Sequence, residues 1–246
     1  VPGSAMRRYK RAYNRNDSQR FEDWKNDSNS KASVSATYPH QIFKVINEDE
    51  QLAEKLWNNL PDLITTDEVI LPMIDVSGSM FGQPLEVAMS LGMYLAQRNK
   101  SEFKDRFLTF SDNPQIVTIQ GLTLAEKFRN IGTADWGMNT DFEKAYTKLL
   151  ELANSHSVDP KSMPTMLLVL SDMQFDESGN GGLHLDDIRD KYRSYGYEMP
   201  KLVFWDLNAH TGQPAECSDE NVAMISGFSP SIMKAILNAE EFNPID

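Results

Sequence analysis

The chain has 246 residues, 40% of them hydrophobic and 10% aromatic, with a formal net charge of -12 at pH 7. This composition is too apolar for a disordered protein, and the length suits one full-sized domain with a short extension. The negative charge disfavours long-range attraction to nucleic acid or to anionic lipid for most of the chain.

The compartment is predicted from what the sequence lacks. No apolar run reaches the ~20 residues that cross a bilayer, and residues 1–8 lack the apolar stretch of a signal peptide. A single cysteine, Cys217, excludes an internal disulfide, and a large fold without disulfides fits a reducing compartment. We therefore expect a cytoplasmic protein that does not span a membrane.

The first 25 residues carry the opposite charge, with seven Lys or Arg against three acids. Residues 6–25 are predicted to form a basic helix in which arginines share one face and tyrosines another. Such an arm can contact RNA phosphates and stack on bases, although a solvated or docking helix is the alternative. The candidate phosphate contacts are Arg7, Arg8, Lys10, Arg11, Arg15 and Arg20, and the candidate stacking residues are Tyr9, Tyr13 and Trp24.

Residues 1–65 are predicted to be a helical N-terminal extension. Residues 26–37 are rich in Ser, Asn and Asp and predict a linker. Two short helices are expected over residues 39–45 and 48–60, the second of them ended by Pro61.

Residues 66–246 alternate between strand and helix patterns. This alternation predicts an α/β fold, a Rossmann-like, doubly wound and mostly parallel sheet flanked by helices. The turn-forming residues 111–114 predict a hairpin and hence one antiparallel edge strand. The expected strands are residues 69–75, 106–110, 115–119, 165–170, 202–205 and 222–225. The expected helices are residues 84–98, 124–130, 141–154, 185–195 and 230–238.

Polar side chains follow the predicted strands at the point where each ends. Asp75-Val76-Ser77-Gly78-Ser79 comes directly after the first strand, and Asp172 follows the strand over residues 165–170. Because parallel strands end at the same edge of a sheet, Asp75 and Asp172 are expected to meet there. Convergent oxygen ligands suit a divalent cation, although each of these residues is also common in a turn or at a helix cap.

With Thr140 between them in sequence, these motifs resemble the metal-ion-dependent adhesion site (MIDAS) of von Willebrand factor A (vWA) domains. The resemblance covers residues 68–240 and implies metal binding by Asp75, Ser77, Ser79, Thr140 and Asp172. It implies that the three hydroxyls bind directly or nearly so, that the two acids act largely through water, and that an Asp or Glu of a protein partner fills an open position. We expect Mg²⁺, with Mn²⁺ and Ca²⁺ as alternatives.

Among vWA proteins, three segments look most like the domain at the end of Ro-type ribonucleoprotein proteins. They are residues 75–80, 139–142 and 226–229. The chain is also similar to an uncharacterised Ro-like family of bacteria, plants and large viruses. In Ro proteins a ring of helical repeats binds small RNAs, so the helices before residue 65 are expected to be a remnant of such a repeat region.

Other residues near the motifs are open to two interpretations. Ser171 and Asp141 can also reach the site, whereas Gln174 and Asp176 either shape its rim or belong to a solvated loop. The four histidines are scattered without metal-ligand spacing, so we expect surface residues.

No catalytic residues are predicted. No G-x-S-x-G motif and no Cys-His pairing is present. An aspartate-based phosphatase would place a general acid two positions after Asp75, where this chain has Ser77. The sequence thus favours a non-enzymatic, metal-dependent protein-binding module. The alternatives are a Ro-like RNA-associated protein and a structural subunit of a viral or multiprotein assembly.

Overall fold

The chain forms two compact units in the computed structural model, which describes residues 3–34, 37–64, 68–75, 77–109, 111, 113–133, 142–172, 185–207 and 222–226. The first, here the helical unit, comprises Val1–Asp62 and Gln120–Asn130. The second, here the sheet unit, comprises Leu63–Ile119 and Ile131–Asp246.

The helical unit begins with two helices where the sequence predicts one. The break falls at Asp17, within a run of Asn, Asp and Ser residues whose side chains favour caps and turns over helix interiors. The single helix expected over residues 6–25 is therefore wrong. The helices of this unit are α1 (Gly3–Asn16), α2 (Ser18–Asn26), α3 (Pro39–Ile46), α4 (Glu50–Asn58) and α6 (Leu124–Gly132) up to Asn130.

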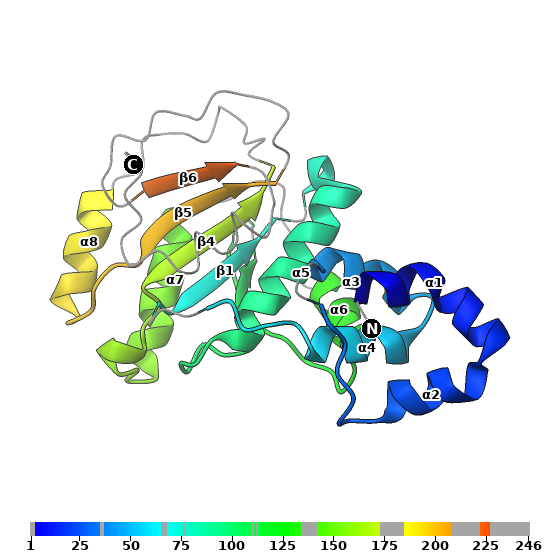
Figure 1. The fold of residues 1–246 in the computed structure, drawn as a ribbon. Coiled ribbons are helices and arrows are strands. Elements are labelled where there is room, and N and C mark those ends of the chain that lie inside the picture. Colours follow the sequence, from blue (N-terminus) through cyan, green and yellow to red (C-terminus); the bar gives the residue numbers. More distant parts are fainter. Residues whose placement is uncertain are drawn as a thin grey trace, which may run out of the picture. The chain divides into compact units, whose positions relative to one another are not determined.

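Aromatic contacts hold α6 against the N-terminal helices, and α6 lies beside α3 and α4 in Figure 1. The Phe128 ring lies 4.7 Å from the Phe43 ring and 5.7 Å from the Trp57 ring, both edge to face. Glu54 on α4 also accepts a hydrogen bond of 2.7 Å from the amide of Leu124. The chain therefore returns to the helical unit after the first strands of the sheet, which sequence position alone does not reveal.

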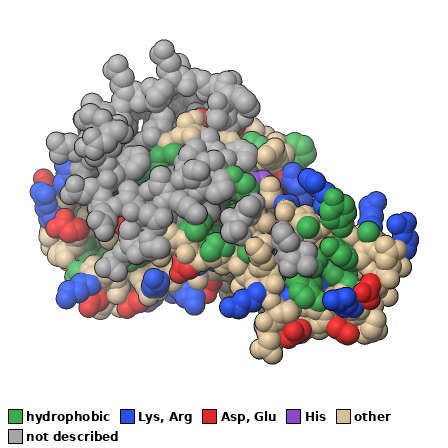
Figure 2. Space-filling view, viewed as in Figure 1, with side chains coloured by type: hydrophobic (Ala, Val, Ile, Leu, Met, Phe, Trp, Pro, Cys, Tyr) green, Lys and Arg blue, Asp and Glu red, His purple; other side chains and the backbone are tan. Residues whose placement is uncertain are grey.

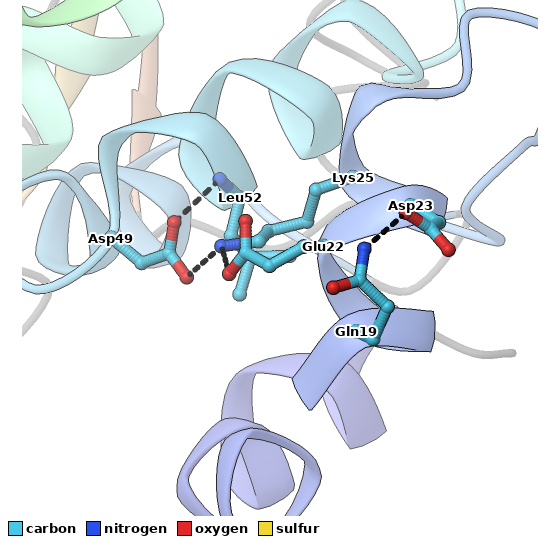
Figure 3. Close-up of polar contacts among 6 residues, drawn as sticks. All are labelled: Gln19, Glu22, Asp23, Lys25, Asp49 and Leu52. Carbon is cyan, nitrogen blue, oxygen red and sulfur yellow. Dashed lines mark hydrogen bonds and ion pairs between the residues drawn. The ribbon is translucent and has the colours of Figure 1, made fainter. Parts of the chain in front are cut away.

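A buried lysine joins α2 to α4 (Figure 3). The Lys25 ammonium lies 2.7 Å from the Glu22 carboxylate and 3.1 Å from that of Asp49, and its side chain is only 5% exposed. Asp49 also caps α4 by accepting a hydrogen bond from the Leu52 amide. Burial alone would lower the pKa of Lys25, but the contacts with Glu22 and Asp49 raise it overall.

The sheet unit is built on six strands in the order β3-β2-β1-β4-β5-β6. All neighbouring strands are parallel except β2 and β3, so β3 is the antiparallel edge strand. The neighbouring strands β1, β4, β5 and β6 can be followed in Figure 1. The predicted α/β fold class and the hairpin are confirmed. The strands are β1 (Ile70–Ile74), β2 (Arg106–Thr109), β3 (Ile116–Thr118), β4 (Met166–Ser171), β5 (Lys201–Asp206) and β6 (Val222–Ser226).

Helices cover both faces of this sheet. On one face α7 (Phe142–Ser155) and α8 (Leu185–Ser194) pack with alternate residues of β1, β4 and β5 in one buried core. On the other face α5 (Gln83–Arg98) approaches β1 closely, since a Cβ atom on Gly92 would lie 2.5 Å from Ile74 Cδ1. Two short 3-10 helices, η1 (Gly78–Met80) and η2 (Pro160–Ser162), complete the described secondary structure.

Two sequence predictions concern other parts of the chain. The helix expected over residues 230–238 lies outside the described ranges. Within them, no helix combines the length and the apolar character that crossing a membrane requires.

Candidate functional site

The carboxyl ends of β1 and β4 bring two of the predicted acids to one edge of the sheet. The strands pair in parallel with Ile74 opposite Leu170, and the Asp75 amide donates to the Leu170 carbonyl at 3.0 Å. Asp75 therefore lies opposite Ser171, and Asp172 follows at once.

A continuous set of hydrogen bonds joins the loop after β1 to the end of β4. Ser79 Oγ donates to Asp172 Oδ1 at 3.2 Å, and Ser77 Oγ lies 3.1 Å from Ser79 Oγ. Because the single hydroxyl hydrogen of Ser79 is directed at Asp172, the Ser77 hydroxyl is the donor to Ser79. The two serine oxygens thus face a common space together with a carboxylate.

Asp75 is held beneath this loop by two donors. Its Oδ1 accepts the Ser77 amide at 2.8 Å, and its Oδ2 accepts the Ser171 hydroxyl at 2.5 Å. The turn of η1 fixes the rest of the loop, since the Met80 amide donates to the Ser77 carbonyl and Met80 is fully buried. Ser171, which the sequence suggested as a further residue near the site, thus contacts Asp75.

Both carboxylates are almost completely buried, Asp75 at 2% exposure and Asp172 at 4%. Burial raises the pKa of Asp75, the hydrogen bonds from Ser171 and Ser77 oppose this effect, and the neighbouring charge of Asp172 adds to it. Two acids placed this way lose hydration and repel each other, so the site favours a positive charge beside them.

One predicted ligand of the cation has no described position. Thr140 lies outside the described residues, as do Asp141, Gln174 and Asp176. Among the residues that are described, no group of three or more His, Cys, Asp or Glu side chains gathers into a metal cluster. The site combines two acids with serine hydroxyls, and its donors are therefore all oxygen.

A third acid at the same edge was not predicted. Asp206 ends β5 in register with Ser171, is 9% exposed, and accepts a hydrogen bond of 3.3 Å from the Ser226 hydroxyl. The signal was present in the sequence, because residues 202–206 form an apolar run that ends in an acid, like the runs before Asp75 and Asp172.

The six basic residues predicted to contact phosphate fall into two groups. Arg7 donates to Gln41 Oε1 at 2.7 Å, and Lys10 forms an ion pair with Glu48. The others are exposed, and basic side chains are visible on the helical unit in Figure 2. These exposed cations are Arg8, Arg11, Arg15 and Arg20.

The expectation of surface histidines is wrong for His40. Its side chain is 7% exposed, because the ring lies on the inner side of α3 beside Tyr38. Burial lowers the pKa of His40 to about 4, and the nearby charges of Lys44 and Arg7 act in the same direction. His156 is exposed as expected, whereas His184 and His210 lie outside the described residues.

Comparisons with known proteins show a family and a similar fold. A family model described as a domain of unknown function (DUF7788) matches residues 70–245. An uncharacterised protein of Acanthamoeba polyphaga mimivirus, L728, is 31% identical over 226 residues, which cover 88% of this chain and 40% of that protein.

Among solved structures, the crystal structure of the Ro (RSR) protein of Deinococcus radiodurans is similar, with a TM-score of 0.56 and 17% identity. The match covers 96% of this chain and 53% of that one, and at this identity it is a likeness of fold. The chain thus spans about half or less of the length of these two proteins.

Proposed function

This chain belongs to the family described as a domain of unknown function (DUF7788), and we propose that it is a vWA-like module that binds a divalent cation at the edge formed by β1 and β4. Ser77, Ser79 and Thr140 would hold the cation, with Asp75 and Asp172 acting largely through water. The observation that carries the proposal is the contact of Ser77, Ser79 and Asp172 above the buried Asp75.

The donor atoms fit magnesium. Adjacent ligands of an octahedral Mg²⁺ ion at 2.0–2.1 Å lie about 2.9 Å from each other. The Oγ atoms of Ser77 and Ser79 are 3.1 Å apart. All-oxygen donors also disfavour zinc and copper, which prefer nitrogen or sulfur.

The balance of charge supports a role in binding. Neutral hydroxyls nearest the ion leave most of its charge uncompensated, so it can accept a carboxylate from outside. The buried Asp75 and Asp172 retain the cation without filling that position. We therefore propose an acidic side chain of a protein partner as the ligand, in a non-enzymatic, cytoplasmic module.

Calorimetry with Mg²⁺ tests the cation site directly. We expect saturable uptake by the wild-type chain, no uptake by Asp75→Ala and strongly weakened uptake by Thr140→Val. Glu151→Ala, an exposed acid on α7, is the matched control and should bind as the wild type does. Absence of magnesium and manganese uptake by the wild-type protein would contradict the proposal.

The partner is tested by pull-down from a source lysate in Mg²⁺ or in EDTA, with wild type and Asp75→Ala. A protein retained only by the wild type in Mg²⁺ supports binding through the cation. A partner that the Asp172→Ala variant retains equally would instead indicate a structural subunit that packs by surface area.

The RNA alternative is favoured by the exposed face of α1. Arg8, Arg11 and Arg15 form no ion pair within the described part of the chain, and Tyr9 beside them is 52% exposed. If they contact phosphates, replacing all three by Ala lowers the slope of log affinity against log salt by about 2 for single-stranded RNA. Fluorescence anisotropy with a labelled oligouridine measures this slope. An unchanged slope would exclude these arginines as contacts.

A further inference from the structure

A large apolar side chain stands next to the candidate cation site. Phe81 follows the D-x-S-x-S loop by two residues and is 88% exposed. Exposed single apolar residues are common on proteins, so exposure alone carries no functional meaning. The position and the backbone of Phe81 supply the further observations.

The backbone holds Phe81 firmly. Its amide donates to the Gly78 carbonyl at 3.3 Å within the turn that carries Ser79, and the preceding side chain, Met80, is fully buried. The next residue, Gly82, has φ of +97°, a conformation that L side chains rarely adopt, and its carbonyl accepts the Glu86 amide at the start of α5. Phe81 is therefore fixed on the side of the turn away from the core.

This fixed position links Phe81 to the serine hydroxyls. In the same short turn Ser79 contacts Asp172 and the Ser77 hydroxyl contacts Ser79. Met80 is buried, and Phe81 is in solvent. A protein segment that presents a carboxylate above the serines would run within reach of the Phe81 ring. Burial of an exposed phenylalanine against a second apolar group contributes favourably to binding.

We propose that Phe81 selects the partner, so that the module recognises an acidic side chain with a bulky apolar neighbour one or two positions away. The inference rests on the proposed cation site and adds a basis for selection among acidic protein segments. The acid gives the dependence on magnesium, and the apolar neighbour gives most of the discrimination between acidic segments. Polar segments that carry an isolated acid are then bound weakly.

The test uses displayed peptide libraries with one fixed Glu and randomised neighbours, alongside libraries with Gln at the fixed position. Peptides captured by the full chain in Mg²⁺ are eluted with EDTA and sequenced. For the wild type we expect EDTA-eluted peptides from the Glu library only, enriched in Leu, Ile, Met or Phe beside the acid. An enriched peptide, synthesised with and without its apolar neighbour, should differ in affinity about tenfold or more.

The variant Phe81→Ser should lose the apolar enrichment while its calorimetric Mg²⁺ uptake stays unchanged, and Phe81→Leu should restore part of it. Leu122→Ser, which removes a 93% exposed leucine of the helical unit, is the matched control and should select the same peptides as the wild type.

The outcomes separate the two proposals. Glu-dependent peptides without an apolar preference, or an apolar preference that persists in Phe81→Ser, would overturn the role of Phe81 and leave the cation site standing. Equal capture from the Glu and Gln libraries, or no EDTA-eluted peptides at all, would overturn both.

Discussion

The helical unit and the sheet unit bury polar groups in different ways. In the sheet unit, β1 and β4 are buried along their whole length, and the acids Asp75 and Asp172 occur only where these strands end. In the helical unit, the ammonium groups of Lys25 and Lys55 lie over aromatic rings in the interior, 5.1 Å and 4.8 Å from the ring centroids. The sheet unit therefore places these charges at strand ends, whereas the helical unit places its buried ammonium groups against aromatic rings.

The largest expected effect comes from the close packing of the sheet unit. Gly92→Leu should lower the free energy of unfolding by about 3 kcal/mol, because no space exists between α5 and the fully buried Ile74. Since Ile74 precedes Asp75, Mg²⁺ uptake should weaken as well. Urea unfolding monitored by tryptophan fluorescence measures the stability.

Gly132→Ala is the matched control for this substitution. A Cβ atom there would meet only the Met89 Cε atom, at an ordinary contact distance of 3.8 Å. We expect a change of less than about 0.5 kcal/mol. Equal stability of Gly92→Leu and the wild type would contradict the close packing of α5 on β1.

The second effect is a dependence of the stability of the helical unit on pH. Because the pKa of His40 is about 4 in the folded chain against an ordinary 6.5, the unfolded chain binds the additional proton between these values. Stability is therefore complete above the ordinary pKa and falls as the pH is lowered, by about 3 kcal/mol in total. Urea unfolding between pH 7 and 4, followed by the fluorescence of Trp24 and Trp57, measures this decrease.

His40→Gln removes the titrating group and should flatten the pH dependence over the same window. Only the slopes are compared, since the substitution itself can change the stability at neutral pH. Parallel curves for the wild type and His40→Gln would show that other groups cause the loss at low pH.

A smaller effect is expected from the buried ion pairs of the helical unit. Lys25→Met leaves the Asp49 carboxylate, 12% exposed, without its cation and should destabilise this unit by about 1 to 2 kcal/mol. Lys31→Met, at an exposed lysine, is the control. Thermal unfolding followed by tryptophan fluorescence distinguishes them, and equal midpoints for both variants would contradict a structural role for Lys25.

The smallest effect has the opposite sign and concerns the edge of the sheet unit. In EDTA at neutral pH, Asp75→Asn should slightly raise the unfolding midpoint, because it removes a buried charge next to Asp172. In Mg²⁺ the order should reverse, since only the wild type gains stability from the cation. A midpoint of Asp75→Asn that rises with Mg²⁺ as much as that of the wild type would show that Asp75 is not needed for binding.

The sequence predicted the sheet well because its strands are continuous apolar runs with turn residues between them. The apolar runs within residues 69–75 and 165–170 predicted buried strands, and the turn residues 111–114 predicted the hairpin. The helix over residues 6–25 was predicted less well. Its charge pattern continues through Asp17, where the backbone leaves the helical conformation with φ of -157° and ψ of 58°, so charge periodicity does not locate the break.

The sequence also predicted that Asp75 and Asp172 meet at one edge of the sheet, because each follows a buried strand of a parallel pair. Asp206 follows the same pattern but was overlooked, since no serine loop accompanies it. The sequence could not show which basic side chains are exposed and which contact other residues of the chain. The partners of Arg7 and Lys10 lie more than thirty positions away in the sequence.

What the sequence alone determined is the class of fold and the set of oxygen side chains at its strand ends, since both depend on local periodicity. Tertiary structure decided which of these oxygens meet: Ser79 contacts Asp172 across 93 positions because β1 and β4 pair in parallel and in register. It also decided the return of residues 120–130 to the helical unit, the burial of His40 and the exposure of Phe81. Each of these depends on packing between distant segments, which no local pattern encodes.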